Sequence, residues 1–320
     1  MSDNILVSIE CITYNHIKYI SQALDSILMQ ETDFKFEVII HDDASTDGTT
    51  EIIKEYERRY PTLIHPIYQT ENQFSKRGFT YISQLILKEV KGKYLAQCEG
   101  DDYWTDPHKL QKQVDFLESH PDYSMCFHQG RIHYEGKNIP DVIATDKLEN
   151  REYTGLELYK HYLPITCSVV MRTEVLRSAI YQQYLNSSIP FGDLPEFLSC
   201  AHCGRIWGMT DNMAVYRKHS GGLTSVFEEP NEQVLKFFAE GHIQLYKIFG
   251  HVYKKQAIKI YVMEHLNFIH QSYQAGKFRG DLLKKILFAH PLCTLRLLIG
   301  QLLISIGIKL HLYQSLQINK

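Results

Sequence analysis

Residues 92–102 of this 320-residue chain read Gly92-Lys-Tyr-Leu-Ala-Gln-Cys98-Glu99-Gly100-Asp101-Asp102, a short run that leads directly into an acidic turn. The run predicts a buried strand because it is brief and begins at a glycine, after a helix-period segment. In open α/β sheets, ligands collect at the carboxyl ends of the strands. The acidic turn is therefore predicted to lie at the ligand-binding edge of a sheet.

The first half of the chain alternates such runs with segments of helical periodicity. Three earlier strands are predicted at residues 5–12, 36–41 and 64–68. Apolar side chains recur every three or four positions, as on one face of a helix, in residues 17–28, 52–60 and 81–90. Strands that alternate with helices are typical of βαβ units. We therefore predict an α/β fold with a Rossmann-like, mostly parallel central sheet flanked by helices.

The second half of the chain is less regular. Asp106-Pro107 predicts a helix N-cap followed by a first-turn proline. An apolar strand is predicted at Thr166–Met171, and a loop-rich stretch from Pro190 to Ser225. From residue 228 the pattern is helical. We therefore predict a domain of residues 1–227 and a helical C-terminal appendage of residues 228–320.

The last apolar run extends from Leu295 to Leu310. A membrane-spanning helix needs about 20 apolar residues, and Gln301, Ser305 and two glycines interrupt this run. Two interpretations stay open: a helix in the protein core, and a helix that contacts a membrane surface or a partner.

Composition excludes some classes of function. The net charge is −3 with basic and acidic residues interspersed, so nucleic acid is not an expected partner. The N-terminus lacks the basic and apolar pattern of a secretory signal. The seven cysteines are scattered and odd in number, which favours free thiols. We therefore expect a cytoplasmic protein.

The acidic turn is the first candidate for chemistry. Three carboxylates within four residues repel one another unless a positive charge is shared between them. Mn²⁺ or Mg²⁺ accepts carboxylate oxygens and takes further ligands from the phosphates of a substrate. A solvated acidic loop is the alternative interpretation of the same residues.

Polar and aromatic residues also follow the first two predicted strands. Thr13-Tyr14-Asn15 comes after the first strand and Asp43 after the second. A tyrosine ring can stack on a nucleotide base, and a carboxylate can accept a base N–H. A buried ring for Tyr14 and a turn position for Asp43 are the alternatives.

The order of these segments is similar to that of family 2 glycosyltransferases with the GT-A fold. The resemblance covers residues 4–225 and includes Ile189-Pro-Phe-Gly-Asp193 and Val215-Tyr-Arg-Lys-His219. It implies that Tyr14, with its neighbours Thr13 and Asn15, contacts the base, usually uracil, and that Asp43 bonds this base. It also implies a diphosphate contact from Lys76 or Arg77, with the choice open.

The same resemblance assigns roles around the acidic turn. Asp101 and Asp102 match the family's metal-binding DxD region, and Glu99 stands where many relatives have aspartate, so it reaches the metal or the ribose. Asp193 stands at the position of the catalytic base, with Glu196 as a rival and a helix N-cap as the structural alternative. His219 matches a late histidine that approaches the metal or diphosphate, and Arg217 and Lys218 add positive charge there.

The resemblance implies an inverting transfer of sugar from a nucleotide sugar, usually a UDP-sugar, to a hydroxyl of a saccharide or lipid-linked saccharide. The bacterial members that it most resembles build surface polysaccharides. The basic and apolar C-terminal helices would then suit peripheral contact with the inner membrane face, and self-association stays open. Two other hypotheses remain: a sugar-phosphate nucleotidyltransferase and a non-catalytic module that binds sugar nucleotides or glycans.

Overall fold

The first four long strands form the parallel half of a central sheet. The computed structural model describes residues 4–222, 232–277 and 279–305. In it β1 (Ile5–Thr13), β2 (Lys35–Asp42), β3 (Ile64–Tyr68) and β4 (Tyr94–Gln97) pair in parallel in the order β3-β2-β1-β4. Both faces of these strands are covered, which explains their continuous apolar runs. The four strands predicted in this half are confirmed.

The sheet continues beyond β4 with strands of both directions. The order is β4-β9-β6-β10-β5, with β5 at Tyr103–Trp104, β6 at Tyr123–Tyr134, β9 at Val170–Arg172 and β10 at Arg205–Lys218. The β6–β10 pairing is long and parallel, whereas the antiparallel pairings of β9 and β5 are short. Two further short strands, β7 (Val142–Ile143) and β8 (Arg151–Tyr153), pair with β6 and β10. The sheet is thus mixed but mostly parallel, as predicted.

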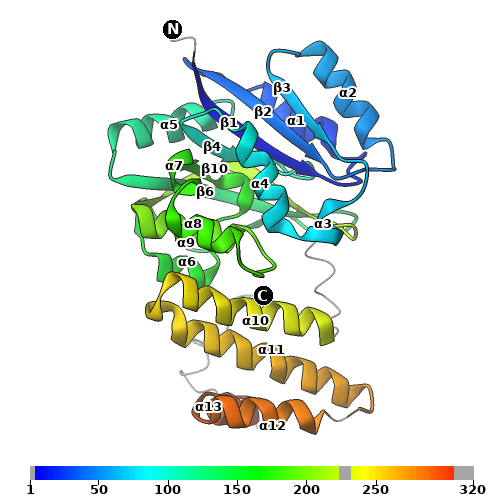
Figure 1. Ribbon diagram of the computed structural model, residues 1–320, viewed down its shortest axis with the longest axis vertical. Helices are drawn as coiled ribbons and strands as arrows, with labels where there is room; N and C mark the ends of the chain where they lie inside the picture. The colour runs from blue at the N-terminus through cyan, green and yellow to red at the C-terminus, as the bar shows by residue number, and fades with distance from the viewer. Residues whose placement is uncertain (1–3, 223–231, 278, 306–320) are drawn as a thin grey trace.

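Helices cover the two faces of the sheet and form two apolar cores (Figure 1). On one face lie α1 (Ile20–Leu28), α2 (Thr49–Arg59) and α5 (Lys109–Ser119). On the other lie α4 (Phe79–Glu89), α6 (Gly155–His161), α7 (Thr173–Leu176), α8 (Ala179–Leu185) and α9 (Asp193–Cys203). Strand β2 shows the alternation directly, because Val38 and Ile40 enter the first core and Ile39 the second.

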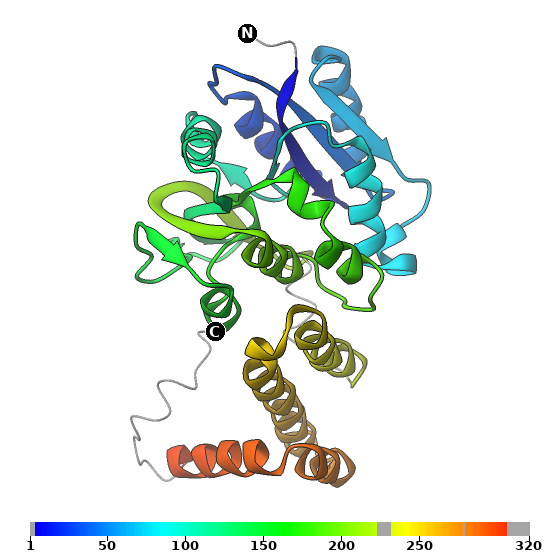
Figure 2. The same ribbon diagram turned by 60° about the vertical axis from the view of Figure 1, so that its left-hand side comes forward.

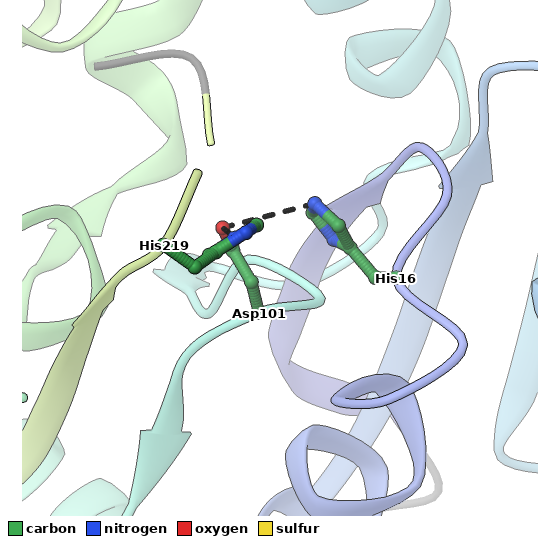
Figure 3. A group of neighbouring side chains, drawn as sticks. All are labelled: His16, Asp101 and His219. Atoms are coloured by element: carbon green, nitrogen blue, oxygen red, sulfur yellow. Dashed lines mark hydrogen bonds and ion pairs between the residues drawn. The ribbon is translucent and has the colours of Figure 1, made fainter. Parts of the chain in front are cut away.

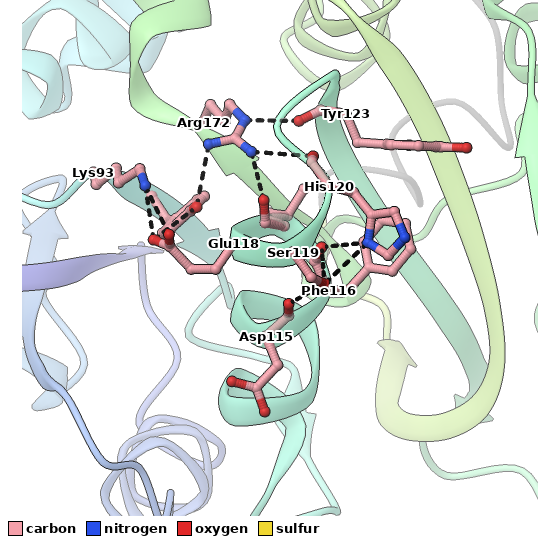
Figure 4. Close-up of polar contacts among 10 residues, drawn as sticks. Lys93, Asp115, Phe116, Glu118, Ser119, His120, Tyr123 and Arg172 are labelled. Carbon is pink, nitrogen blue, oxygen red and sulfur yellow. Dashed lines mark hydrogen bonds and ion pairs between the residues drawn. The ribbon is translucent and has the colours of Figure 1, made fainter.

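A buried arginine ties α5 to the sheet (Figure 4). The guanidinium of Arg172, on β9, donates to the carbonyl oxygens of Tyr123 at 2.7 Å and Leu117 at 2.6 Å. It also donates to the carbonyl of His120, the C-cap residue of α5, at 3.3 Å. The last carbonyls of a helix have no partner within the helix. Arg172 therefore closes the end of α5 and fixes it against β6.

Three sequence predictions about local structure were wrong. The stretch from Pro190 to Ser225, predicted as loop-rich, contains α9 and the 14-residue β10, and its last residues from 223 lie outside the described part of the chain. Pro195 is tolerated because it lies in the first turn of α9, where backbone N–H groups lack helical partners. The polar residues around Asp211 lie where the pairing of β10 with β6 shifts register, so they interrupt the apolar pattern without ending the strand.

The predicted strand Thr166–Met171 is only partly a strand. Residues Thr166–Ser168 form a 3-10 turn, and β9 begins at Val170. The reason is that the carbonyl of Cys167 accepts from the Trp104 indole N–H at 2.8 Å and that of Ser168 from the Gln113 amide at 2.9 Å. The helix predicted at Asp106-Pro107 begins at Lys109, and the Asp106 carboxylate caps the preceding turn by accepting from His108 N–H at 2.8 Å.

Within residues 232–277 and 279–305, the structure describes four α-helices. They are α10 (Glu232–Phe249), α11 (Lys254–Gln274), α12 (Gly280–Ala289) and α13 (Pro291–Ser305). Helices α10 and α11 contribute to the second core of the sheet and also to a separate apolar cluster with α12 and α13. Figures 1 and 2 show α12 and α13 farthest from the sheet.

The predicted domain boundary, between residues 227 and 228, lies outside the described residues, as does the end of the Leu295–Leu310 run. Among the residues that the structure describes, no helix is both long and apolar enough to cross a membrane.

Candidate active site

The loops after β1 and β2 are joined by hydrogen bonds at the carboxyl edge of the sheet. The Asn15 side-chain oxygen accepts from Thr46 N–H at 2.8 Å, and Asn15 N–H donates to Ser45 Oγ at 2.9 Å. Asn15 holds a positive φ of 57°, a backbone conformation that asparagine tolerates better than most residues. The Asn15 side chain is thus used within the loop, while the ring of Tyr14 is 44% exposed beside it. The alternative of a buried Tyr14 ring is wrong.

Asp43 connects this edge to the segment that carries Lys76 and Arg77. Its buried carboxylate accepts from the backbone N–H groups of Gln73 at 2.7 Å and Phe74 at 2.9 Å, at the start of α3 (Gln73–Arg77). Exposed Lys76 pairs with Glu71, and the exposed guanidinium of Arg77 lies 4.4 Å from the ring of Tyr81. Asp43 therefore positions the short helix on which both basic residues lie.

The acidic turn packs tightly on the end of β1. Gly100 N–H donates to the carbonyl of Ile12 at 2.9 Å, and Asp102 N–H donates to that of Glu99 at 3.0 Å. A Cβ atom at Gly100 would lie 2.6 Å from Thr13 Oγ1, so a larger residue would push the two segments apart. Glycine at this position lets the turn approach the loop that bears Thr13.

Arg217, at the end of β10, holds the acidic turn from the other side. Its N–H donates to Asp102 Oδ1 at 2.8 Å and its Nε to the carbonyl of Asp101 at 2.8 Å. The remaining guanidinium nitrogens donate to Glu135 at 3.1 Å and Gln22 at 2.7 Å. This arginine, expected from the sequence to add charge near a leaving group, is buried and has partners at all three guanidinium nitrogens.

Two histidines converge on the turn (Figure 3). The Nε2 atoms of His219 and His16 lie 3.0 Å and 3.7 Å from Asp101 Oδ2. Each of the three residues offers a ligand atom within 4.8 Å of the others. Burial acts to raise the pKa of Asp101, but the His219 hydrogen bond and the two neighbouring rings outweigh it, so the pKa lies below its usual value. The Asp101 carboxylate is therefore charged.

The proton of the neutral His219 ring has a defined position in this arrangement. Gly221 N–H donates to Nδ1 at 3.2 Å, so Nδ1 is the unprotonated nitrogen. Nε2 then carries the proton and donates a hydrogen bond to Asp101 Oδ2. The Nδ1 atom of His16 is buried and has no hydrogen-bond partner.

The structure brings Asp101 and His219 together, as the sequence suggested, and keeps Asp102 apart from them. Asp102 is the most buried aspartate of the turn, and burial and the charge of Asp101 hold its pKa well above the usual value. His16 was not predicted as a ligand. The signal for it was its place directly after Thr13-Tyr14-Asn15, at the end of a strand adjacent to β4.

A cavity of about 500 Å³ adjoins the acidic turn and contains Asp193. Asp193 is the first residue of α9, and its carboxylate accepts from the Tyr162 hydroxyl at 2.6 Å and from Leu194 N–H at 2.8 Å. Burial raises the pKa of Asp193 above its usual value. Glu99 lines the same cavity, and its pKa is raised well above the usual range by burial and then by Asp101. The apolar part of the lining comes mainly from Phe74, Phe79, Ile165, Phe191, Phe237 and Phe238.

Two further carboxyl groups lie in the cavity wall. Gln97 Nε2 donates to Glu10 at 3.3 Å and to Glu196 at 2.8 Å, and the Tyr181 hydroxyl donates to Glu196 at 2.8 Å. Burial raises the pKa of Glu10 to about 7. Burial, and then the charge of Glu10, raises the pKa of Glu196 to about 8. Glu196, which the sequence offered as an alternative to Asp193 for the catalytic base, therefore belongs to a separate buried network.

Comparison with known proteins identifies one family. The family model described as "Glycosyl transferase family 2" matches residues 8–179. A Bacillus subtilis relative named "Putative teichuronic acid biosynthesis glycosyltransferase TuaG" is 37% identical over 227 residues, which are 69% of this chain and 82% of the relative. An uncharacterized Mycobacterium tuberculosis protein is 38% identical over 222 residues, 68% of this chain. The chain spans about 60% of the length of that relative.

Among solved structures, the fold is similar to that of S. aureus TarS residues 1–349 in complex with UDP-GlcNAc. The TM-score is 0.62 at 20% sequence identity, and the match covers 89% of this chain and 79% of the other. This similarity confirms the GT-A arrangement of the sheet.

The raised pKa of Glu196 predicts a pH-dependent stability. Folded protein retains the Glu196 proton up to about pH 8, whereas the unfolded chain releases it near 4.5, so the folded state binds more protons between these values. The free energy of unfolding must then fall as the pH rises through this window. Glu196→Gln removes the titrating group. Its free energy of unfolding, measured by urea titration, should therefore fall less steeply with rising pH than that of wild type. The exposed Glu89→Gln serves as control; equal slopes for Glu196→Gln and wild type would contradict the assignment.

Proposed function

The chain belongs to glycosyl transferase family 2, and from this membership we propose that it moves a sugar from a UDP-sugar to a hydroxyl of a saccharide acceptor, with inversion at the anomeric carbon. The observation that carries the proposal is the arrangement at one edge of the sheet. A charged Asp101 between two histidines lies beside a cavity that holds a separate carboxyl group, Asp193. Such a transfer needs a cation site for the diphosphate and, apart from it, a base for the acceptor.

His16, Asp101 and His219 would hold the divalent cation. Their ligand atoms lie within 4.8 Å of one another, so the donor set suits a small cation. Two imidazoles with one carboxylate favour Mn²⁺ over Mg²⁺, since Mg²⁺ prefers oxygen ligands alone. When bound, the ion supplies positive charge that stabilises the departing diphosphate.

Coordination through His219 Nε2 would place the ring proton on Nδ1. The hydrogen bond from Gly221 N–H to Nδ1 would then be lost. Binding at this site is therefore coupled to the turn that follows β10. Asp102, whose Oδ1 is held by Arg217 N–H, would add negative charge next to the ligand set once a cation is bound, because a nearby positive charge favours the charged form of a buried carboxyl group.

The nucleotide would lie across the loops after β1 and β2. The exposed ring of Tyr14 stacks on the uracil, with Thr13 and Asn15 shaping the loop beneath it. Asp43 accepts the base N–H with the lone pairs that its two backbone bonds leave free. Glu99 faces the ribose side, and Lys76 or Arg77 reaches the diphosphate. The TarS complex with UDP-GlcNAc supports a UDP-sugar as donor.

Asp193 is the proposed base. An acceptor hydroxyl transfers its proton to the Asp193 carboxylate as its oxygen bonds to the anomeric carbon, and the bond from that carbon to the diphosphate oxygen breaks. The Tyr162 hydrogen bond orients the carboxylate, and burial raises its affinity for the proton. The aromatic cavity wall suits the apolar faces of sugar rings. The name of the Bacillus subtilis relative supports an acceptor in cell-surface polysaccharide synthesis.

Asp193→Asn should separate chemistry from donor binding. The amide keeps the shape of the side chain but cannot take the acceptor proton, so transfer should fall about 100-fold to 10,000-fold. Binding of UDP-sugar, measured by thermal shift with Mn²⁺, should stay within about twofold of wild type. Exposed Asp33→Asn is the matched control. Transfer by Asp193→Asn near the wild-type rate would show that the base is another group.

The last two helices present an apolar surface with basic flanks. Phe288 is 95% exposed and Leu292 84% exposed, with Leu295 and Ile299 on the same face of α13 as Leu292. Lys284, Lys285 and Arg296 are exposed nearby, and no acidic residue follows Asp281 in the sequence. We propose that this surface rests on an anionic membrane, where a lipid-linked acceptor would be reached. Residues 1–227 would then form the catalytic domain and residues 228–320 its membrane-contacting appendage.

The wild-type chain should sediment with phosphatidylcholine vesicles that contain about one third phosphatidylserine, and much less with pure phosphatidylcholine. Leu292→Glu with Ile299→Glu should weaken this binding at least about tenfold, because two charges would enter the interface. The matched control is Ile143→Glu, an exposed apolar residue on β7. If the double variant bound these vesicles as well as wild type does, the proposal that this surface contacts the membrane would be wrong. Loss of a dimer in the double variant, without vesicle binding by wild type, would assign the surface to self-association.

A further inference from the structure

The Glu10–Gln97–Glu196 network lies in the cavity, but neither the proposed donor site nor the proposed base uses it. Its residues come from β1, from β4 and from α9, and all three line the cavity. Glu196 lies one helical turn after Asp193, so a group bound by Glu196 would lie near the acceptor hydroxyl that reacts. The network is thus placed to contact the acceptor.

The amide N–H groups of Gln97 and the hydroxyl of Tyr181 are already used as donors within this network. Gln97 Nε2 already donates to both carboxyl groups, and the Tyr181 hydroxyl donates to Glu196. The other side-chain atom of the amide, Gln97 Oε1, is buried without a partner although Gln97 is only 3% exposed. A buried carbonyl oxygen without a partner is unfavourable. Gln97 Oε1 therefore lacks a hydrogen-bond donor.

The cavity also has few positive charges to compensate its carboxyl groups. Glu99 and Asp193 add two carboxyl groups to its lining. Burial lowers the pKa of His242 to about 4, so this lining residue is neutral at pH 7. Among the described lining residues, Lys218 is the one lysine or arginine, and its ammonium lies 5.7 Å from the centre of the Tyr134 ring. A ligand that brings its own positive charge would favour the charged forms of these buried carboxyl groups.

A protonated primary amine would supply both the missing hydrogen-bond donor and the missing positive charge. It supplies three N–H donors for three acceptor groups, and one positive charge, whereas a sugar hydroxyl supplies one donor and no charge. We propose that Glu10, Gln97 and Glu196 bind the free ammonium group of an amino-sugar acceptor, so that the enzyme selects a saccharide with an unacetylated amine. This inference rests on the proposed transferase function and names the acceptor class for that site.

The raised pKa values of Glu10 and Glu196 support the same conclusion. Without a ligand, the two buried carboxyl groups hold protons to about pH 7 and about pH 8. An ammonium group between them would favour their charged forms. Replacing the amine by an acetamide would remove the charge and add bulk, so an N-acetylated sugar should be a poor substitute.

The test compares three probes, D-glucosamine, D-glucose and N-acetyl-D-glucosamine, by NMR titration at about pH 7, where a sugar amine is substantially protonated. Wild-type protein should bind glucosamine at least about tenfold more tightly than the other two. Glu10→Gln and Glu196→Gln should each reduce this preference to within about twofold, while the exposed Glu89→Gln keeps it. UDP binding, measured on every variant, reports whether the fold and donor site are intact.

A wild-type protein that binds glucosamine and glucose equally would overturn the proposal, as would a preference that survives both substitutions. The sugar titrations are performed with and without UDP and Mn²⁺. Absence of UDP binding would contradict the proposed transferase function and leave the amine preference measurable. UDP binding without amine preference would contradict only the acceptor class.

Discussion

The turn Glu99-Gly100-Asp101-Asp102 holds three carboxyl groups close together in a largely buried position, where their negative charges would repel one another. Many of the surrounding contacts stabilise this arrangement. The fold treats the three differently. Asp101 lies between two histidines, which keep it charged, whereas burial favours the protonated forms of Glu99 and Asp102. A shared turn thus yields one anion at its tip and two carboxyl groups that gain protons unless a cation is near. This difference in charge is part of the proposal that the turn holds a divalent cation.

The turn keeps its shape because distant parts of the chain meet on it. Gly100 bonds to the end of β1, and Arg217 reaches it from the end of β10. Since β1 and β10 belong to different halves of the sheet, the site forms only when the whole mixed sheet has assembled. The clamp by Arg217 also brings His219, two residues later, over Asp101. Helix α9 carries Asp193 and Glu196, and both line the cavity together with Glu99.

The sequence predicted the parallel half of the fold well, because strands buried on both faces carry continuous apolar runs. Segments of α9 and β10 were missed, since Pro195 and the polar residues around Asp211 resemble loop signals when their hydrogen bonds are unknown. Asp101 and His219 were identified from the resemblance to a family. His16 was not, although it directly follows Thr13-Tyr14-Asn15, because its contact with Asp101 depends on how the loop after β1 lies against the acidic turn. The hydrogen bonds that Asp43 accepts from the start of α3 could not be predicted either, and nor could the unpartnered Oε1 atom of Gln97. Both depend on contacts between residues far apart in the sequence.

The central claim is that His16, Asp101 and His219 together bind a divalent cation that the nucleotide shares. The most direct measurement is the binding of Mn²⁺, followed by the loss of its free-ion electron paramagnetic resonance signal, with and without UDP. The account predicts one Mn²⁺ per wild-type chain in the presence of UDP, and affinity at least about tenfold weaker in His16→Gln, because a ligand is lost. Mn²⁺ binding in His16→Gln equal to that of wild type would contradict it.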